Sequence, residues 1–254
     1  MQAMGIPVWK PKDTPHPPPP SPSRGEGEEE MPSVLLNSYP SSLPSPLEGR
    51  REERLGAGRG VRGSSCSHLS WDELRATVQS CTRCDLAKTR TQTVFGTGNQ
   101  QAVWMVIGEA PGAEEDKQGL PFVGKAGQLL NNMLAAIGMP RETVYIANVL
   151  KCRPPNNRDP KPDEAANCRG YLERQIELVN PALILVVGRI AAQNMLQTDA
   201  PLARLRGREH LAPVSRTPVV VTYHPAYLLR QPADKRKAWQ DLLFAREVAA
   251  RYVR

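Results

Sequence analysis

Four of the five cysteines have the spacing of ligands to a metal centre. Cys81 and Cys84 form a C-x2-C pair, and Cys152 and Cys168 follow after a long gap as a C-x15-C pair. A C-x2-C pair brings two thiolates to one ion or cluster, whereas the wide second pair fits a cluster held between a loop and a helix. Zinc is an alternative metal for this site, and four unrelated core cysteines are another interpretation, because free cysteine is commonly buried.

The first quarter of the chain has the composition of a disordered segment. Residues 1–65 hold 12 of the 25 prolines, include the acidic run at 26–30 and contain almost no aromatic residue. Such a segment cannot bury enough apolar surface to offset its chain entropy. We therefore expect a disordered proline-rich extension over residues 1–68 and a folded domain over 69–254. The extension also resembles translated intergenic sequence, so a natural start at Met31 or later is an alternative.

The net charge of +7 is concentrated in the folded part. Residues 1–65 contain eight basic and eight acidic side chains, which cancel. A basic domain suits a polyanionic partner, because basic side chains displace counterions from phosphates, although simple solubility explains the charge equally well. The sequence contains no apolar run of about 18 residues and no signal-peptide core. We therefore expect no membrane association and a reducing, cytoplasmic location.

Apolar runs typical of strands alternate with helical patterns along the folded part. The predicted strands cover residues 103–107, 144–150, 182–187 and 218–223. The predicted helices cover residues 71–80, 125–137, 162–179, 189–196 and 234–250. This alternation predicts an α/β fold of three layers, α/β/α, around a central, mostly parallel, four-stranded sheet.

Three loops follow predicted strands at the edge where such sheets bind ligands, the carboxyl ends of the strands. They cover residues 108–112, 148–157 and 224–226. Asn148 and Cys152 lie in the second loop, four residues apart. A metal bound through Cys152 is therefore expected to fix the loop that presents Asn148.

Four motifs in and near these loops resemble one known family. They are GEAPGAEED at 108–116, PFVGKAG at 121–127, KCRPP at 151–155 and HPAYLLR at 224–230. Together with the cysteines, they resemble the family 4 uracil-DNA glycosylases, which are iron-sulfur repair enzymes of bacteria and archaea. The resemblance runs from about residue 69 to the C-terminus. It implies that the domain flips uracil out of DNA and hydrolyses its N-glycosidic bond. It also implies a [4Fe-4S] cluster on Cys81, Cys84, Cys152 and Cys168.

The resemblance assigns three residues to the uracil base. Phe122 stacks on the base, Asn148 pairs with the O4 and N3–H edge, and His224 stabilises charge on O2 of the departing base. Each residue also has a structural interpretation. Phe122 could anchor its loop, Asn148 could hold the loop after its strand, and His224 could be a structural histidine at a strand end.

The first loop supplies the remaining substrate contacts. By resemblance, Glu109 binds uracil or orders the attacking water, and Ala110 stands where the family 1 enzymes place a water-activating aspartate. Whether Glu109 acts as a general base stays open. Gly108, Ala110, Pro111 and Gly112 line the same loop, and its backbone amides could contact uracil O2. Glu115 resembles a residue that excludes the 5-methyl group of thymine, and a charged surface position is the alternative.

A third set of residues is assigned to DNA. Tyr227, Leu228 and Leu229 resemble the wedge that fills the space left by a flipped base, although they could equally pack the start of a helix. Arg153 and Arg230 are expected to contact phosphates. A wider basic set could extend this track or form a solvated face, and it consists of Arg158, Lys161, Arg206, Arg208, Lys235, Arg236 and Lys237.

Two other function classes stay open on the sequence. One is a DNA-binding protein of the same superfamily that binds uracil-DNA without efficient turnover, with iron-sulfur or zinc at the cysteines. A covalent DNA trap is disfavoured, because residues 151–162 contain no histidine. The other class is a zinc-stabilised nucleotide-binding protein. The expected partner is uracil-containing DNA, single- or double-stranded, bound by a monomer.

Overall fold

The computed structural model describes residues 66–253. Residues 1–65 of the extension predicted over 1–68 lie outside the described residues. Cys66 is already buried against Leu74, Val78 and Tyr171, so the described fold includes residues just before the predicted boundary at 69. Within residues 66–253 no helix has both the length and the apolar character needed to cross a membrane.

The core of the domain is a six-stranded sheet in the order β1-β3-β2-β4-β6-β5. The four inner strands are parallel: β3 (Tyr145–Asn148), β2 (Trp104–Gly108), β4 (Leu183–Val187) and β6 (Pro218–Thr222). They are the four strands predicted from the sequence. The expected strand count of four was wrong, because β1 (Thr97–Gly98) and β5 (Glu209–Leu211) add antiparallel edges. Both edge strands are too short and too polar to give a strand pattern.

The inner strands are buried on both faces, which explains their continuous apolar sequences. Every residue of β2, β3, β4 and β6 is buried. Alternate side chains enter two separate cores. Met105, Ile107 and Ile184 face one core, while Val106, Ile146 and Leu185 face the other. The three-layer α/β/α architecture predicted from the sequence is confirmed.

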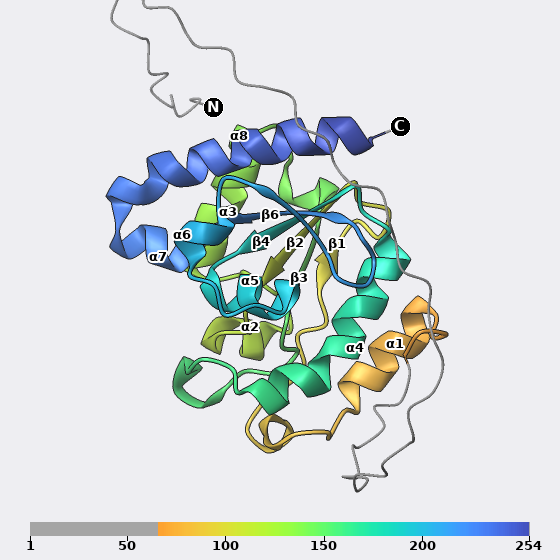
Figure 1. Cartoon of the computed structure of the whole chain (residues 1–254). Coiled ribbons are helices and arrows are strands. Elements are labelled where there is room, and N and C mark those ends of the chain that lie inside the picture. The colour runs from red at the N-terminus through yellow and green to blue at the C-terminus, as the bar shows by residue number, and fades with distance from the viewer. Residues whose placement is uncertain (1–65, 254) are drawn as a thin grey trace, which may run out of the picture. The chain divides into compact units, whose positions relative to one another are not determined.

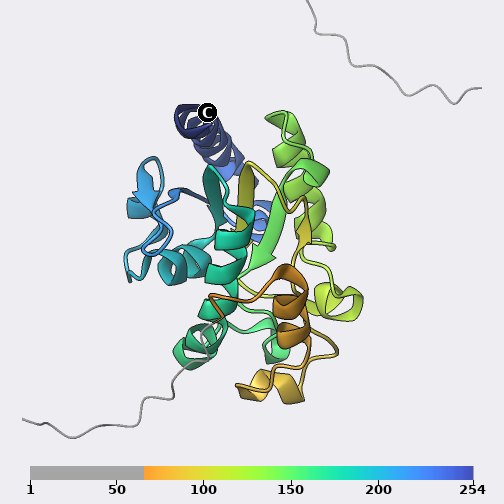
Figure 2. The ribbon, with the colours of Figure 1, turned by 90° about the vertical axis from the view of Figure 1, so that its right-hand side faces the viewer.

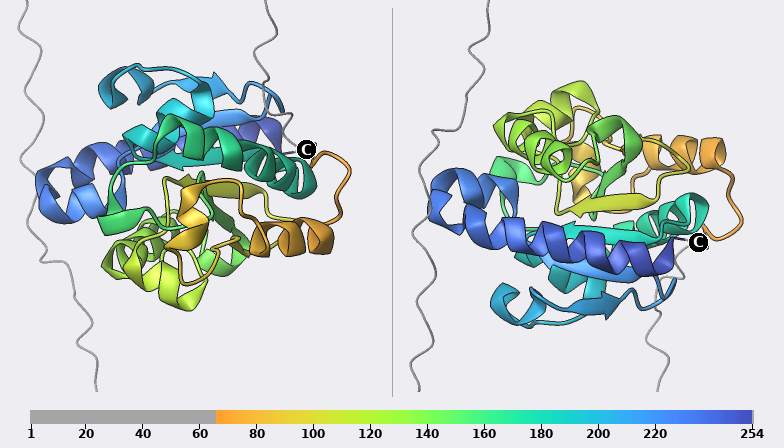
Figure 3. Two further views of the ribbon diagram at one scale, coloured as in Figure 1. Left: turned by 90° about the horizontal axis from the view of Figure 1, so that it is seen from below. Right: turned by 90° about the horizontal axis from the view of Figure 1, so that it is seen from above.

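Two helices cover each face of the sheet. The first core packs against α4 (Pro162–Val179) and α5 (Arg189–Leu196), and the second against α3 (Lys125–Ala136) and α8 (Lys235–Tyr252). Figure 3 shows α3 and α4 on opposite sides of the strands. These helices and α1 (Trp71–Gln79) match the five predicted helices closely, and α1 lies beside α4 (Figures 1 and 2).

Local signals in the sequence explain where these helices begin. Ser70 starts α1, and its amide and hydroxyl both donate to Glu73 Oε2, at 2.8 and 2.7 Å. Pro162 occupies the first position of α4, where its missing N–H costs nothing. The Lys161 amide donates to Glu164 Oε2 at 2.9 Å. Gly138, with φ of +76°, follows the end of α3.

Three short helices were not predicted. α2 (Ala113–Gln118) lies between the predicted strand 103–107 and the predicted helix 125–137, α6 (Leu202–Leu205) follows α5, and α7 (Pro225–Arg230) follows β6. The four 3-10 turns are η1 (Asp85–Lys88), η2 (Arg141–Thr143), η3 (Pro155–Asn157) and η4 (Pro232–Asp234). None of the three helices is long enough to give an amphipathic period. α2 nevertheless carries Glu115 and begins after Gly112, and α7 carries residues 227–230 and begins after His224.

Candidate active site

The ends of β2 and β3 bring the first two predicted loops together. Gly108 and Asn148 are partners in the parallel register of these strands. The pairing continues past the strands, because Val149 N donates to Gly108 O at 2.9 Å and Leu150 N donates to Glu109 O at 3.0 Å. The backbone of Glu109 is therefore fixed by the loop that carries Asn148.

Asn148 carries an unpaired acceptor in the interior. The residue is 2% exposed. Its Oδ1 is buried and has no hydrogen-bond partner within residues 66–253. A buried acceptor left without a partner costs about 1–3 kcal/mol, so such atoms mark ligand sites. A side chain at Gly108 would collide with this oxygen, so glycine keeps the approach to it open.

Phe122 lies close to Gly108 and has an uncommon backbone conformation. Its φ is +53°, in the left-handed region that bulky residues rarely adopt, at a cost of roughly 1–3 kcal/mol. A side chain at Gly108 would lie 2.6 Å from Phe122 Cζ. The Phe122 ring also faces the His224 ring, with centroids 5.7 Å apart and planes tilted by 32°. The structure therefore brings Phe122, Asn148 and His224 together.

His224 is held as a neutral hydrogen-bond donor. It caps the start of α7, and its Nδ1 accepts from Ala226 N at 3.1 Å. Burial, assisted by Arg230, lowers the pKa of His224 to about 4, so the ring is neutral at pH 7. With Nδ1 accepting, the proton of the neutral ring resides on Nε2. Gly188, with φ of +97°, leaves room for the imidazole, because a side chain there would press on it.

The pKa of the Glu109 carboxyl group lies near neutral pH. Burial raises its pKa to about 7 from an ordinary value of 4.5, and Asp159 raises it further while Arg189 opposes the shift. The residue is half-buried directly after β2. The loop continues through half-buried Ala110 and buried Pro111 to Gly112, which caps α2. A group with this pKa can exchange a proton at physiological pH.

Glu115 is engaged by the loop that carries Phe122. Its Oε1 accepts from Val123 N at 3.0 Å and from Gly124 N at 3.2 Å. The residue belongs to α2 and is half-buried rather than freely exposed. Glu115 therefore organises the Phe122 loop, whatever it does toward a bound base.

The three predicted wedge residues have different environments. Leu229 is 44% exposed at the end of α7, whereas Leu228 is 1% exposed and belongs to the core. Tyr227 stacks on Tyr223, with centroids 5.1 Å apart, and donates to Asp234 Oδ2 at 2.6 Å. Only Leu229 presents a free apolar side chain, so Leu228 and Tyr227 serve to anchor α7 in this structure.

The arginines predicted to contact phosphates differ in whether another group of the protein already binds them. Arg230 is exposed, and Arg153 donates from Nε to Asn157 Oδ1 at 2.8 Å within its own loop. Arg158 pairs with Glu164 at 2.6 Å, and Arg206 pairs with Asp241 at 2.7 Å. The last two arginines are therefore already neutralised within the protein.

The four predicted cysteine ligands line one pocket. Cys81 and Cys84 follow α1, Cys152 lies in the β3 loop, and Cys168 lies on α4. Arg90 Nη1 donates to Cys152 Sγ at 3.1 Å. Burial raises the pKa of the Cys168 thiol to about 12, so a thiolate here needs a cationic partner. Residues 66–253 contain no group of three or more His, Cys, Asp or Glu arranged to hold one metal ion.

Comparisons with known proteins agree with this geometry. Residues 95–243 match the uracil DNA glycosylase superfamily. The chain is 47% identical over 178 residues to the type-4 uracil-DNA glycosylase of Archaeoglobus fulgidus, covering 68% of this chain and 89% of that protein. The chain belongs to the type-4 uracil-DNA glycosylases. The family member of Thermotoga maritima is 43% identical over 159 residues, 62% of this chain and 82% of that protein. A type-5 uracil-DNA glycosylase of Pyrobaculum aerophilum is more distant, at 27% identity over 169 residues, 61% of this chain and 74% of that protein.

Lys151 links the cysteine pocket to the strand end that carries Asn148. It was not predicted from the sequence as a site residue. It is 1% exposed, and its Nζ donates to Asn148 O at 2.8 Å and to Gln175 Oε1 at 2.6 Å. Burial lowers the pKa of Lys151 to about 7, while Cys168 and Cys152 oppose that shift. In the sequence it is the first residue of the KCRPP motif, and only its place directly after the apolar run 144–150 could have indicated burial.

The β6 side of the site has its own buried network. Buried Asp241 on α8 accepts from Thr222 Oγ1 at 2.7 Å and from Arg206 Nη2 at 2.9 Å. The Arg206 guanidinium lies over the Tyr223 ring, 4.1 Å from its centroid. Tyr223 in turn stacks on Tyr227 of α7. This network supports the segment that carries His224.

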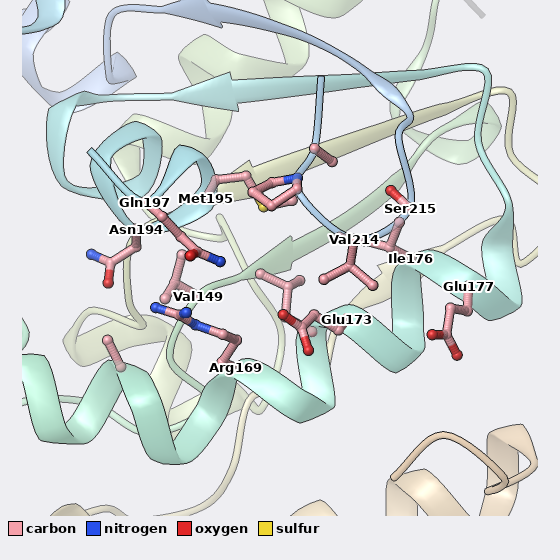
Figure 4. Close-up of a pocket in the computed structure, with 14 residues that line it drawn as sticks. Val149, Arg169, Glu173, Ile176, Glu177, Asn194, Met195, Gln197, Val214 and Ser215 are labelled. Atoms are coloured by element: carbon pink, nitrogen blue, oxygen red, sulfur yellow. The ribbon is translucent and has the colours of Figure 1, made fainter. Parts of the chain in front are cut away.

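A separate groove lies between α4, α5 and the loop after β5 (Figure 4). Its lining is largely apolar and includes Leu172, Ile176, Met195 and Val214. Arg169 and Glu173 of α4 stand at its edge in Figure 4. None of the residues predicted to bind uracil or metal lines this groove.

Proposed function

We propose that this chain excises uracil from DNA by hydrolysing the N-glycosidic bond of deoxyuridine, which leaves an abasic site for base excision repair. The buried Asn148 Oδ1 has no hydrogen-bond partner among residues 66–253, and it carries the proposal because the edge of a uracil base would supply the missing donor. Family membership supports the same activity. The curated relatives are named for this activity on uracil-DNA.

Uracil is read along one edge. Asn148 Oδ1 accepts from N3–H, and its Nδ2 donates to O4, while cytosine presents the opposite polarity at these positions. The Phe122 ring stacks on the base. The Nε2–H of His224 donates to O2. The backbone amides of the loop that contains Ala110 and Gly112 contact the same oxygen. Glu115 borders the 5-position, where a methyl group distinguishes thymine.

Hydrolysis transfers the base to water. The water oxygen bonds to C1′ of the deoxyribose as the C1′–N1 bond breaks, and the bonding electron pair leaves on N1 of uracil. The neutral His224 donor stabilises the charge that spreads to O2. Glu109 orders the water and, when ionised, accepts the proton that the water loses. The uracil anion is then protonated from solvent.

The DNA must deform before this chemistry, because a stacked base is out of reach. Leu229 enters the space that the flipped nucleotide leaves, since it is the exposed apolar residue of α7. Arg153 and Arg230 contact the flanking phosphates. One monomer is sufficient, because all of these groups come from one chain.

We further propose that Cys81, Cys84, Cys152 and Cys168 hold a [4Fe-4S] cluster. Four thiols around one pocket, with an arginine donating to one sulfur, are a suitable donor set. When bound, the cluster would cross-link the end of α1, the β3 loop and α4. Anaerobic purification should give about four irons per chain with visible charge-transfer absorbance. Stoichiometric zinc without iron would contradict the cluster.

The enzymatic proposal is tested with a uracil-containing oligonucleotide. The protein should create alkali-labile breaks at uracil and leave matched cytosine and thymine oligonucleotides intact. Asn148→Ala and His224→Ala should each reduce release strongly. His210→Ala is the matched control, because its ring contacts Leu205 O at 2.8 Å at the far edge of the sheet. Tight binding to the uracil strand without any break would instead indicate a binding protein.

A further inference from the structure

The loop that carries Phe122 is held from one side by an arginine outside all of the recognised motifs. Arg141 begins η2, just before β3. Its Nη2 donates to Pro121 O at 2.6 Å, and its Nη1 donates to Phe122 O at 3.2 Å. Two carbonyls that are adjacent in the chain thus share one planar guanidinium.

The position of Arg141 is itself fixed. Its Nη1 also donates to Asn131 Oδ1 on α3, at 3.0 Å. The guanidinium is half-buried, and hydrogen bonds from a charged donor are stronger than neutral ones. Arg141 therefore joins the Phe122 loop to α3 and to the start of β3, the strand that ends at Asn148.

The opposite side of the loop is held by a carboxylate. Glu115 accepts from the amides of Val123 and Gly124, as described above. Gly127 on α3 lies directly against Phe122, and a side chain there would collide with the Phe122 carbonyl. The backbone of residues 121–124 is thus fixed by two opposite charges. Fixation is required because the left-handed conformation of Phe122 is unfavourable for a residue with a bulky side chain.

We propose that Arg141 is a positioning residue for base stacking, which holds Phe122 in its left-handed conformation so that the ring is preformed as the stacking surface. The inference rests on the proposed function, since it takes uracil as the base that stacks on Phe122. Arg141 acts only through Phe122 and touches no reacting atom. A misplacement of about 1 Å in such a group can cost roughly 100-fold in rate.

A double-mutant cycle tests the inference. Arg141→Met should lower kcat/KM for uracil excision by roughly 10- to 100-fold, and so should Phe122→Ala. The double variant should be no worse than Phe122→Ala alone, because Arg141 has nothing left to position. Inhibition by free uracil should weaken in Arg141→Met, while affinity for abasic DNA stays unchanged. Arg141→Lys, which keeps one donor group, should recover part of the activity.

A matched control separates positioning from general stability. Arg174 also donates from its guanidinium to a carbonyl, Leu69 O at 2.7 Å, but at the start of the described fold. Arg174→Met should lower the melting temperature and leave inhibition by free uracil unchanged. The inference is wrong if the loss in kcat/KM of the double variant equals the product of the two single losses. It is also wrong if inhibition by free uracil is unchanged in Arg141→Met. Absence of any uracil release by the wild-type protein would instead overturn the proposed function.

Discussion

The loops that leave β3 and β6 present the two polar side chains that converge with Phe122, yet they are held by different means. The β3 loop carries Asn148, then buried Lys151, and then Cys152 in the cysteine pocket. The β6 segment carries His224 and rests on Asp241, Arg206 and stacked tyrosines. One loop depends on a bound cofactor in our proposal, whereas the other is held by protein groups alone.

The difference shows that the two segments that carry Asn148 and His224 can be held in place independently of each other. A metal bound at Cys152 would tie this loop to α1 and α4, in addition to the core contacts of Val149 and Leu150. A buried ion pair with satisfied hydrogen bonds does the same for the other loop, but only while both partners remain. Changes to one support should therefore leave the other loop intact.

The largest expected effect is from loss of a cysteine on the β3 side. Cys152→Ser should lose the metal centre and lower uracil excision by more than roughly 100-fold, because the Asn148 loop is released. Iron content and kcat/KM are the measurements. Cys66→Ser is the control, since Cys66 lies outside the cysteine pocket, and it should keep its iron. Full activity in an iron-free Cys152→Ser protein would remove the proposed link.

The next effect is on the β6 side. Arg206→Met leaves buried Asp241 without its charged partner, which should lower the free energy of unfolding by about 3 kcal/mol. Urea denaturation measures the loss. Iron content should stay at the wild-type level, because the β3 support is untouched. Loss of iron together with stability would show that the two supports are coupled.

Titration of Glu109 gives a smaller effect with a definite sign. Its folded-state pKa of about 7 lies above the ordinary 4.5, so the folded protein binds this proton more tightly. The resulting stability is full below about pH 4.5 and is lost as the pH rises through about 7. Glu109→Gln should remove that loss and be more stable at pH 8 by about 1–2 kcal/mol.

The same variant tests whether Glu109 accepts a proton during the reaction. If the carboxylate accepts a proton from water, kcat/KM of the wild-type protein should rise with pH through about 7. Glu109→Gln should lose this limb. A rising limb that persists in Glu109→Gln would assign the titration to another group.

The smallest effect is expected at the tip of α7. Leu229→Ala should lower activity on double-stranded uracil-DNA several-fold and leave single-stranded activity and stability nearly unchanged, because Leu229 is exposed. Leu228→Ala should instead lower stability by about 2–5 kcal/mol, because Leu228 is buried. Equal losses on both DNA forms for Leu229→Ala would exclude a wedge.

Much of the fold and of the convergence at the site followed from the sequence. Asn148, near the carboxyl end of the apolar run 144–150, was placed with Cys152 on one loop at the carboxyl edge of the sheet. The motifs then placed Phe122 and His224 near it. The two polar edge strands and α2 were missed because two to six residues carry no recognisable period. Gly112 and Gly119 around an acidic run were the available signal for α2.

Other features depend on contacts that no local pattern encodes. Arg141 reaches carbonyls about twenty residues earlier in the chain, and in our proposal this contact, together with Glu115, holds Phe122 in its left-handed conformation. Buried Lys151 donates to Gln175 on α4, 24 residues away in the chain. The helical register of α7 decides that Leu228 points inward and Leu229 outward, and that register was not predicted.

Amide hydrogen exchange tests the two-support comparison most directly. The wild-type protein and Cys168→Ser are compared over residues 148–157 and over residues 218–231. We expect exchange in Cys168→Ser to accelerate strongly over 148–157 and to stay at the wild-type rate over 218–231. Equal acceleration of both segments, or none in either, would contradict separate supports for Asn148 and His224.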